Sequence, residues 1–132
     1  MLIIDTHVLV WFVSDPDSLS VAAKNAIDHT IAMGGEILIS SISVWEIAML
    51  IAKGRLIISL DIETWLSQVN KIGGFRFIPI DNEIGYKSTL LPGEFHNDPA
   101  DRMIVATARK FAIPLVTADQ KIRAYQHVKT IW

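Results

Sequence analysis

Five acidic side chains stand where a fold could bring them together on one substrate. Asp5 follows a short apolar run near the N-terminus, and Asp119 follows another near the C-terminus. Glu46 comes soon after a third apolar run, and Asp98 and Asp101 open an apolar helical pattern. Grouped carboxylates repel one another and raise each other's pKa values, and a divalent cation removes that conflict. Oxygen ligands without a histidine–cysteine set favour Mg²⁺ or Mn²⁺ over zinc.

The elements that must position these acids alternate along the chain. Short buried runs predict strands at residues 2–4, 37–39, 75–80, 114–117 and 128–132. Pro79 indicates that the third strand lies at an edge or ends there. Helical spacing of apolar residues, counted with the capping residues, predicts helices over 6–13, 20–34, 43–54, 61–73, 81–91 and 98–112. Ser43 and Glu46 match a capping box, so Ser43 is the predicted cap of the third helix.

This alternation predicts an α/β sandwich with a mainly parallel sheet and one domain over residues 1–132, since no repeat or linker interrupts it. Ligands of such sheets bind beyond the carboxyl ends of the strands. Asp5 and Asp119 directly follow two predicted strands, and Glu46 lies in the first turn after another. The pattern leaves open which end of the sheet the helix beginning at Asp98 approaches.

Each acid also has a purely structural interpretation. Asp98 before Pro99 is typical of a helix N-cap, and Glu46 and Asp101 fit capping positions in a first turn. Asp119 can begin a turn, and Asp5 can start a helix. Because all five are expected at the same end of one sheet, we favour a shared functional site.

Composition excludes several classes of protein. The chain has 132 residues, of which 51% are hydrophobic and 20% charged, so a disordered protein is excluded. No apolar run approaches the ~18–20 residues needed to span a bilayer. The N-terminus lacks a basic region, so no signal peptide is predicted. The absence of cysteine agrees with a cytoplasmic location. A net charge of −2 does not indicate a nucleic-acid binder, so a local basic rim or a metal ion would have to attract any nucleic acid.

In chain order the acids lie in four short motifs that resemble those of PIN-domain proteins, and more narrowly those of VapC-type toxin ribonucleases. The resemblance extends from Leu2 to Trp132, and the order and spacing of the motifs make it specific. The motifs are Ile3-Ile4-Asp5-Thr6-His7, Ser40-x-x-Ser43-Val44-x-Glu46-Ile47, Asp98-Pro99-Ala100-Asp101-Arg102-x-Ile104-x-Ala106-Thr107-Ala108 and Val116-Thr117-Ala118-Asp119.

The resemblance implies a three-layer α/β/α fold and an endoribonuclease with Mg²⁺ or Mn²⁺ as cofactor. It also implies a homodimer in the cytoplasm, acting on RNA and held inactive by a cognate antitoxin protein. Carried over by motif, the catalytic and metal-binding set comprises Asp5, Glu46, Asp101 and Asp119. One or two ions bound by Asp5 and Asp101 or Asp119 would activate water, and Glu46 would orient or deprotonate it. Asp98 is an additional acid of the third motif.

Several neighbours of the acids have two interpretations each. Thr6 and Thr117 flank the site and are candidates to hydrogen-bond carboxylates or metal-bound water. Arg102 would either clamp a phosphate or pair with Asp98 or another acid. His7 and His96 could contact RNA or metal, although a lone histidine is more often a hydrogen-bonded structural residue.

Basic and aromatic residues are interpreted more conservatively. Lys53, Arg55, Lys121 and Arg123 could form a basic rim for RNA, although scattered solvated charges are the default. Trp11, in an apolar run, and Trp45 are interpreted as packing residues rather than as base-stacking groups, and Trp45 is expected to turn toward a helix or dimer contact.

Two other functions compete with the ribonuclease hypothesis. Phosphoryl transfer with Asp5 as nucleophile would be expected to show a D-x-D-x-T pattern, which is absent because Thr6-His7-Val8 follows Asp5. The remaining alternative is a non-catalytic PIN-like module that uses the acidic pocket to bind a metal or a basic partner.

Overall fold

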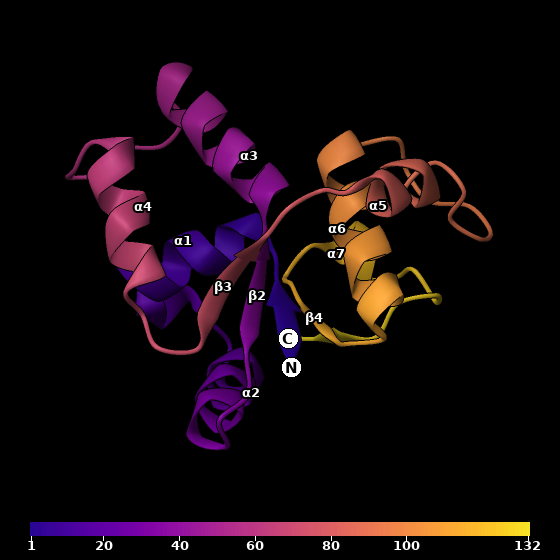
Figure 1. The fold of residues 1–132 in the computed structure, drawn as a ribbon, viewed down its shortest axis with the longest axis horizontal. Helices are drawn as coiled ribbons and strands as arrows, with labels where there is room; N and C mark the ends of the chain where they lie inside the picture. Colours follow the sequence, from indigo (N-terminus) through magenta and orange to yellow (C-terminus); the bar gives the residue numbers. More distant parts are fainter.

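The computed structural model describes residues 1–132, and a five-stranded parallel sheet runs through its centre (Figure 1). The strand order is β3-β2-β1-β4-β5. Every neighbouring pair is parallel, which confirms the predicted sheet. The strands are β1 (Leu2–Ile4), β2 (Ile37–Ser40), β3 (Phe75–Ile78), β4 (Leu115–Val116) and β5 (Thr130–Ile131).

Helices cover both faces of this sheet. They are α1 (Thr6–Ser14), a 3₁₀ turn (Pro16–Ser18), α2 (Val21–Ala32), α3 (Ser41–Ala52), α4 (Ile62–Asn70), α5 (Asn82–Lys87), α6 (Pro99–Phe111) and α7 (Gln120–Arg123). None of them is long and apolar enough to cross a membrane. The helix predicted over residues 81–91 is shorter than expected, because α5 ends before the turns around Pro92.

Two separate hydrophobic clusters establish the three layers. Alternate residues of a strand point to opposite faces, so Leu2 and Ile4 pack with α1, α2 and α4, whereas Ile3 packs with α6 and α7. Because β1 is buried on both sides, its sequence is uniformly apolar. The α/β/α expectation is therefore confirmed, and β3 lies at the sheet edge, as Pro79 indicated.

The order of the strands creates a switch point beside β1. From β1 the chain builds outward through β2 to β3, and then α5 and α6 carry it to β4 on the other side of β1. The chain segments that leave β1 and β4 therefore diverge at the carboxyl edge of the sheet. This is the place where open parallel sheets bind ligands.

Most predicted helix starts are confirmed, but the capping box at Ser43 is wrong. Helix α3 begins at Ser41, and the Ser40 hydroxyl accepts the hydrogen bond from the Ile42 N–H at 3.2 Å. No loop separates β2 from α3, so the last strand residue itself occupies the cap position. Ser43 consequently lies inside the helix and is completely buried.

Candidate active site

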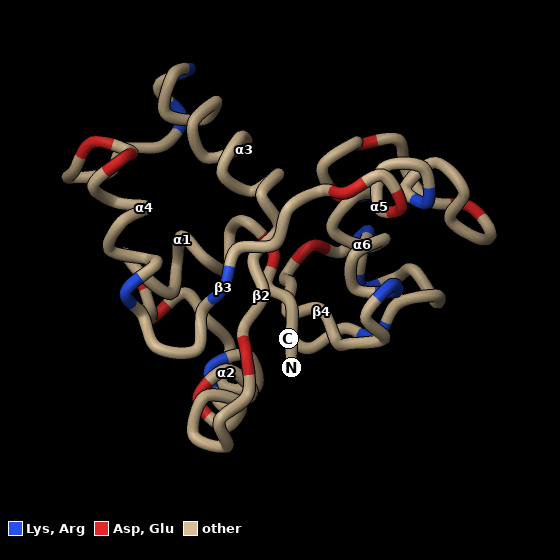
Figure 2. The backbone as a smooth tube through the Cα atoms, in the orientation of Figure 1, with Lys and Arg blue, Asp and Glu red and all other residues tan.

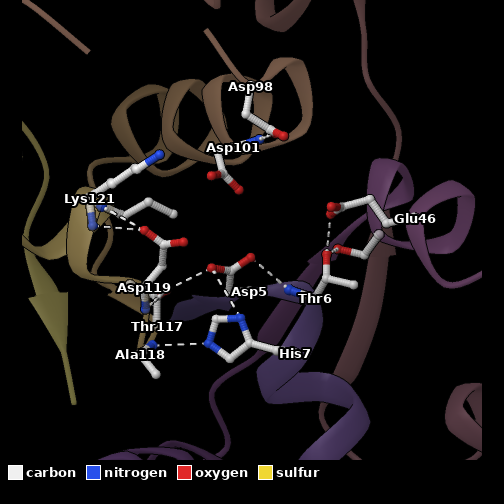
Figure 3. Close-up of polar contacts among 12 residues, drawn as sticks. Asp5, Thr6, His7, Glu46, Asp98, Asp101, Thr117, Ala118, Asp119 and Lys121 are labelled. Carbon is white, nitrogen blue, oxygen red and sulfur yellow. Dashed lines mark hydrogen bonds and ion pairs between the residues drawn. The ribbon is translucent and has the colours of Figure 1, made fainter. Parts of the chain in front are cut away.

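All five acids named above line one cleft of about 410 Å³ at the carboxyl edge of the sheet. The lining comes from the segments after β1 and β4, the first turns of α3 and the start of α6. Figure 3 shows the carboxylates of Asp5, Asp101 and Asp119 turned toward one another, with Glu46 on the opposite wall. The structure therefore decides that α6 begins over the carboxyl edge.

Asp5 lies at the centre of this cleft and is held by its neighbours. Its Oδ1 accepts the Thr6 N–H at 2.8 Å, which makes Asp5 the N-cap of α1. Its Oδ2 accepts the Thr117 hydroxyl at 2.6 Å, across the boundary between β1 and β4. The residue is only 3% exposed, so these two bonds determine where its carboxylate points.

The two acids of α6 have different surroundings. Asp98 Oδ1 accepts the Asp101 N–H at 2.9 Å, so the Asp98 side chain caps the helix and is exposed. Asp101 is one turn further in, and its carboxylate extends from α6 toward Asp5 (Figure 3). The cap therefore orients the turn that carries Asp101 into the cleft.

The carboxyl of Asp101 has a strongly raised pKa. Burial is the largest cause, and together with the charges of four neighbouring acids, Asp5, Asp98, Asp119 and Glu46, it raises this pKa to about 8. Without a counter-ion, Asp101 therefore holds a proton near neutral pH. A pKa displaced this far marks a crowded acidic site that is suited to a cation.

Glu46 is positioned by a contact between α1 and α3. The Thr6 hydroxyl lies 2.5 Å from Glu46 Oε1 and 2.8 Å from Ser43 Oγ. Burial raises the pKa of Glu46, the hydrogen bond from Thr6 opposes that change, and the charges of Asp5 and Asp98 add to it. Ser43 was expected to be a helix cap and is instead part of this polar contact.

Asp119 caps the short helix α7. Its Oδ1 accepts the N–H groups of Lys121 at 2.8 Å and Ile122 at 3.1 Å, while its own N–H donates to Thr117 Oγ1 at 3.0 Å. Thr117 thus links Asp119 to Asp5. The second carboxylate oxygen of Asp119 faces the cleft (Figure 3).

Two histidines are tied to the site in different ways. His7 Nε2 accepts the Ala118 N–H at 3.0 Å, so the proton of the neutral ring is on Nδ1. His96 Nε2 is buried 3.0 Å from Asp101 Oδ2, at an angle that does not meet hydrogen-bond geometry. The proximity of His96 to Asp101 was not predicted. The only sequence signal is that His96 stands two residues before the helix cap.

Arg102 pairs with no acid, which contradicts one of its two interpretations. Its guanidinium donates to the main-chain carbonyls of Ser88 at 2.7 Å, Phe95 at 2.9 Å and His96 at 3.2 Å. These bonds fasten the segment before α6 to the helix itself. Arg102 therefore has a structural function here.

Arg102→Lys is expected to lower the free energy of unfolding by about 2–4 kcal/mol. The compact lysine ammonium cannot donate to all three carbonyls that the planar guanidinium reaches. Urea unfolding followed by circular dichroism measures this effect. Arg123→Lys, on an exposed position of α7, is the matched control. Equal midpoints for the two variants would contradict the assigned function of Arg102.

The predicted basic rim is only partly present at the cleft. Arg55 lines it, whereas Lys53 and Arg123 do not. Lys121 lies beside Asp119 and lines a neighbouring hollow with His96. In Figure 2 the basic residues are dispersed over several helices and loops.

The chemistry of the acidic groups fits a hard divalent cation, although no three side chains stand in position to ligate one ion. Five carboxylates line the cleft, with no cysteine in the chain to compete. Burial and the charges of the neighbouring acids favour the protonated form of Asp101. An ion that neutralised this charge would allow the carboxylates to ionise and to approach it.

Comparisons with known proteins agree with the motifs and the fold. A sequence model of the PIN domain matches residues 2–128. The chain is 33% identical to Ribonuclease VapC22 from Mycobacterium tuberculosis (strain ATCC 25618 / H37Rv), over 99% of this chain and 98% of that protein.

Solved structures share the fold at lower sequence identity. VapBC2 from Rickettsia felis, bound to a DNA fragment from its promoter, aligns with a TM-score of 0.68 at 17% identity, covering 98% of this chain and 96% of that chain. DNA-bound VapBC from Salmonella typhimurium aligns with a TM-score of 0.67 at 18% identity, covering 98% and 97%. The chain therefore belongs to the PIN-domain family, and within it to the VapC group.

Proposed function

We propose that this protein is an endoribonuclease, the toxin of a toxin–antitoxin pair, which hydrolyses RNA phosphodiester bonds with Mg²⁺ or Mn²⁺. One observation carries the proposal: five acids line a single cleft, where burial and the charges of the neighbouring acids raise the pKa of Asp101 to about 8. A cluster of carboxylates in which ionisation is this unfavourable without a cation is expected at a metal-dependent site. The similarity to a protein named as a ribonuclease supports the choice of substrate.

In this proposal Asp5, Asp101 and Asp119 would hold the metal. The bound ion would lower the pKa of water and neutralise charge that develops on the phosphate. Thr117 orients Asp5 through its hydroxyl, and it also receives the Asp119 N–H. These bonds keep two of the carboxylates in place before any ion binds.

Glu46 is the proposed base that orients or deprotonates the attacking water. Because the pKa of Glu46 is raised, its carboxylate binds a proton more readily than an ordinary carboxylate, which suits a general base. Thr6 holds one of its oxygens, so the other is available for water. Asp98 would act indirectly, by capping the turn that presents Asp101.

The proposal also assigns partners. One solved structure that shares the fold is a toxin–antitoxin complex from Klebsiella pneumoniae, which supports a cognate antitoxin as inhibitor. A homodimer is part of the same proposal. The activity would belong to the cytoplasm, where cellular RNA is found.

Glu46→Gln is expected to lower kcat by about 10²-fold, because the amide cannot accept a proton from water. The assay is cleavage of a fluorophore–quencher single-stranded RNA by purified protein in Mn²⁺. Glu63→Gln, an exposed position in the first turn of α4, is the matched control.

Equal activity of Glu46→Gln and Glu63→Gln would contradict the proposed base. Stabilisation of the wild type by Mn²⁺ without cleavage of any RNA would instead favour the non-catalytic metal-binding module.

A further inference from the structure

The cleft that holds the acids has a second, apolar part. Besides the acids, its lining includes Val10, Trp11, Leu50, Arg55 and Leu56. Trp11 follows His7 by four residues on α1, and Leu50 follows Glu46 by four residues on α3. One helical turn advances about 5.4 Å, so both helices carry the lining outward from the acids. Hydrolysis at the acids does not explain why an apolar wall continues the cleft.

Trp11 differs from its neighbours on α1 in what it contacts. Val10 and Phe12 pack against the hydrophobic core, whereas Trp11 is half-buried and is absent from that cluster. Its indole contacts the His7 ring at a centroid distance of 4.9 Å and the Trp132 ring at 5.7 Å. The hydrogen bond from Ala118 to His7 fixes one of these supports. The indole is therefore a braced aromatic surface on the wall of the cleft.

Arg55 is the only lysine or arginine in the lining of this cleft. Its side chain is exposed and takes part in no ion pair of the structure. A free guanidinium beside an apolar wall attracts a phosphate of a polynucleotide. The acids would repel the same polynucleotide, so Arg55 contributes attraction that the acidic part lacks.

We propose that Trp11 stacks on one nucleobase of single-stranded RNA next to the scissile bond, with Arg55 contacting the RNA backbone. This inference rests on the proposed ribonuclease function and adds a substrate-positioning residue to it. Aromatic side chains bind single strands by stacking on bases, and every base offers such a face. The stack would hold the strand in register with the acids while tolerating different sequences.

The test is an abasic scan of the fluorophore–quencher RNA that the wild-type protein cleaves. Removing one base at a time is expected to raise KM by about 5- to 150-fold at a single position near the cut, the range of base–aromatic stacking. Trp11→Leu is expected to raise KM for the intact RNA by a similar factor, with little change in kcat. In that variant the abasic position should cause no further loss, whereas Trp11→Phe should retain part of the effect.

Trp45→Leu is the matched control, because Trp45 is 54% exposed and does not line the cleft. Wild-type cleavage that is insensitive to every abasic position would overturn the stacking inference and leave the nuclease proposal intact. The stacking inference would also be overturned, with the nuclease proposal intact, if Trp11→Leu weakened only inhibition by the antitoxin. RNA that binds in a Trp11-dependent way but is never cut would support the stack and refute the nuclease. RNA that is neither bound nor cut would refute both.

Discussion

Asp101→Asn is expected to lower kcat for RNA cleavage by at least about 10³-fold, while the metal-free protein becomes more stable. In the proposed mechanism activity falls because the substitution removes one of the charged oxygens that would hold the metal. The same loss is expected for Asp5→Asn, whose carboxylate lies at the centre of the site (Figure 3). Cleavage of the labelled single-stranded RNA in Mn²⁺ measures both variants.

Stability rises because the Asp101 side chain lowers the free energy of unfolding of the metal-free protein. Its pKa is raised from 3.8 to about 8, so at pH 7 folding requires proton uptake by a group that is ionised in the unfolded chain. Asparagine has no such requirement, and we expect about 2–4 kcal/mol of added stability, or roughly 7–14 °C in Tm. Thermal melts in EDTA at pH 7 measure this change.

The matched control is Asp61→Asn on the exposed N-cap of α4, where asparagine caps as well as aspartate. It should leave kcat unchanged and should not raise Tm. Full cleavage by purified Asp101→Asn or Asp5→Asn would refute the metal-site proposal. A lower Tm for Asp101→Asn in EDTA would show that charge repulsion does not dominate at this position.

Chelation of divalent metal is expected to abolish cleavage and to expose an unusual pH dependence of stability. Because the pKa of Asp101 is higher in the folded state, the folded protein binds more protons than the unfolded chain between about pH 4 and pH 8. The contribution of this group to stability therefore falls as pH rises through that window. The raised pKa of Glu46 acts in the same direction.

Adding Mn²⁺ should reverse this trend, because the ion binds the ionised carboxylates and competes with protons. Its effect on Tm should thus be larger at pH 8 than at pH 5, and smaller in Asp101→Asn. Thermal melts across this pH range, with Mn²⁺ or with EDTA, provide the measurement. Cleavage that persists in EDTA, or a Mn²⁺ effect that is equal at both pH values, would contradict the prediction.

Local patterns in the sequence were sufficient for most of the elements and for the candidate acids, but they did not predict the short helix α7. Alternation of buried runs with helical spacing predicted the parallel sheet, and the Asp98-Pro99 pair predicted the start of α6. These signals are short-range, because a strand period or a helix cap involves residues within a few positions of one another. The extent of each element was less predictable, as the shorter α5 shows.

Contacts across the chain were decided only by the tertiary structure. Thr117 reaches Asp5 over a separation of 112 residues, and Thr6 reaches Glu46 over 40. Both contacts depend on the strand order around β1, which no local pattern encodes. The same order set α6 over the carboxyl edge, where the Asp98 side chain caps the helix and the Asp101 carboxylate extends toward Asp5.

Residue type alone was a poor guide to the function of three side chains. Arg102 binds carbonyl groups rather than acids, Ser43 contacts Thr6 rather than capping its helix, and Trp11 lines the cleft. The partners that decide these functions come from other elements of the fold, α1 for Ser43 and the segment before α6 for Arg102. The sequence by itself determined which acids were available, and packing determined which of them face one another.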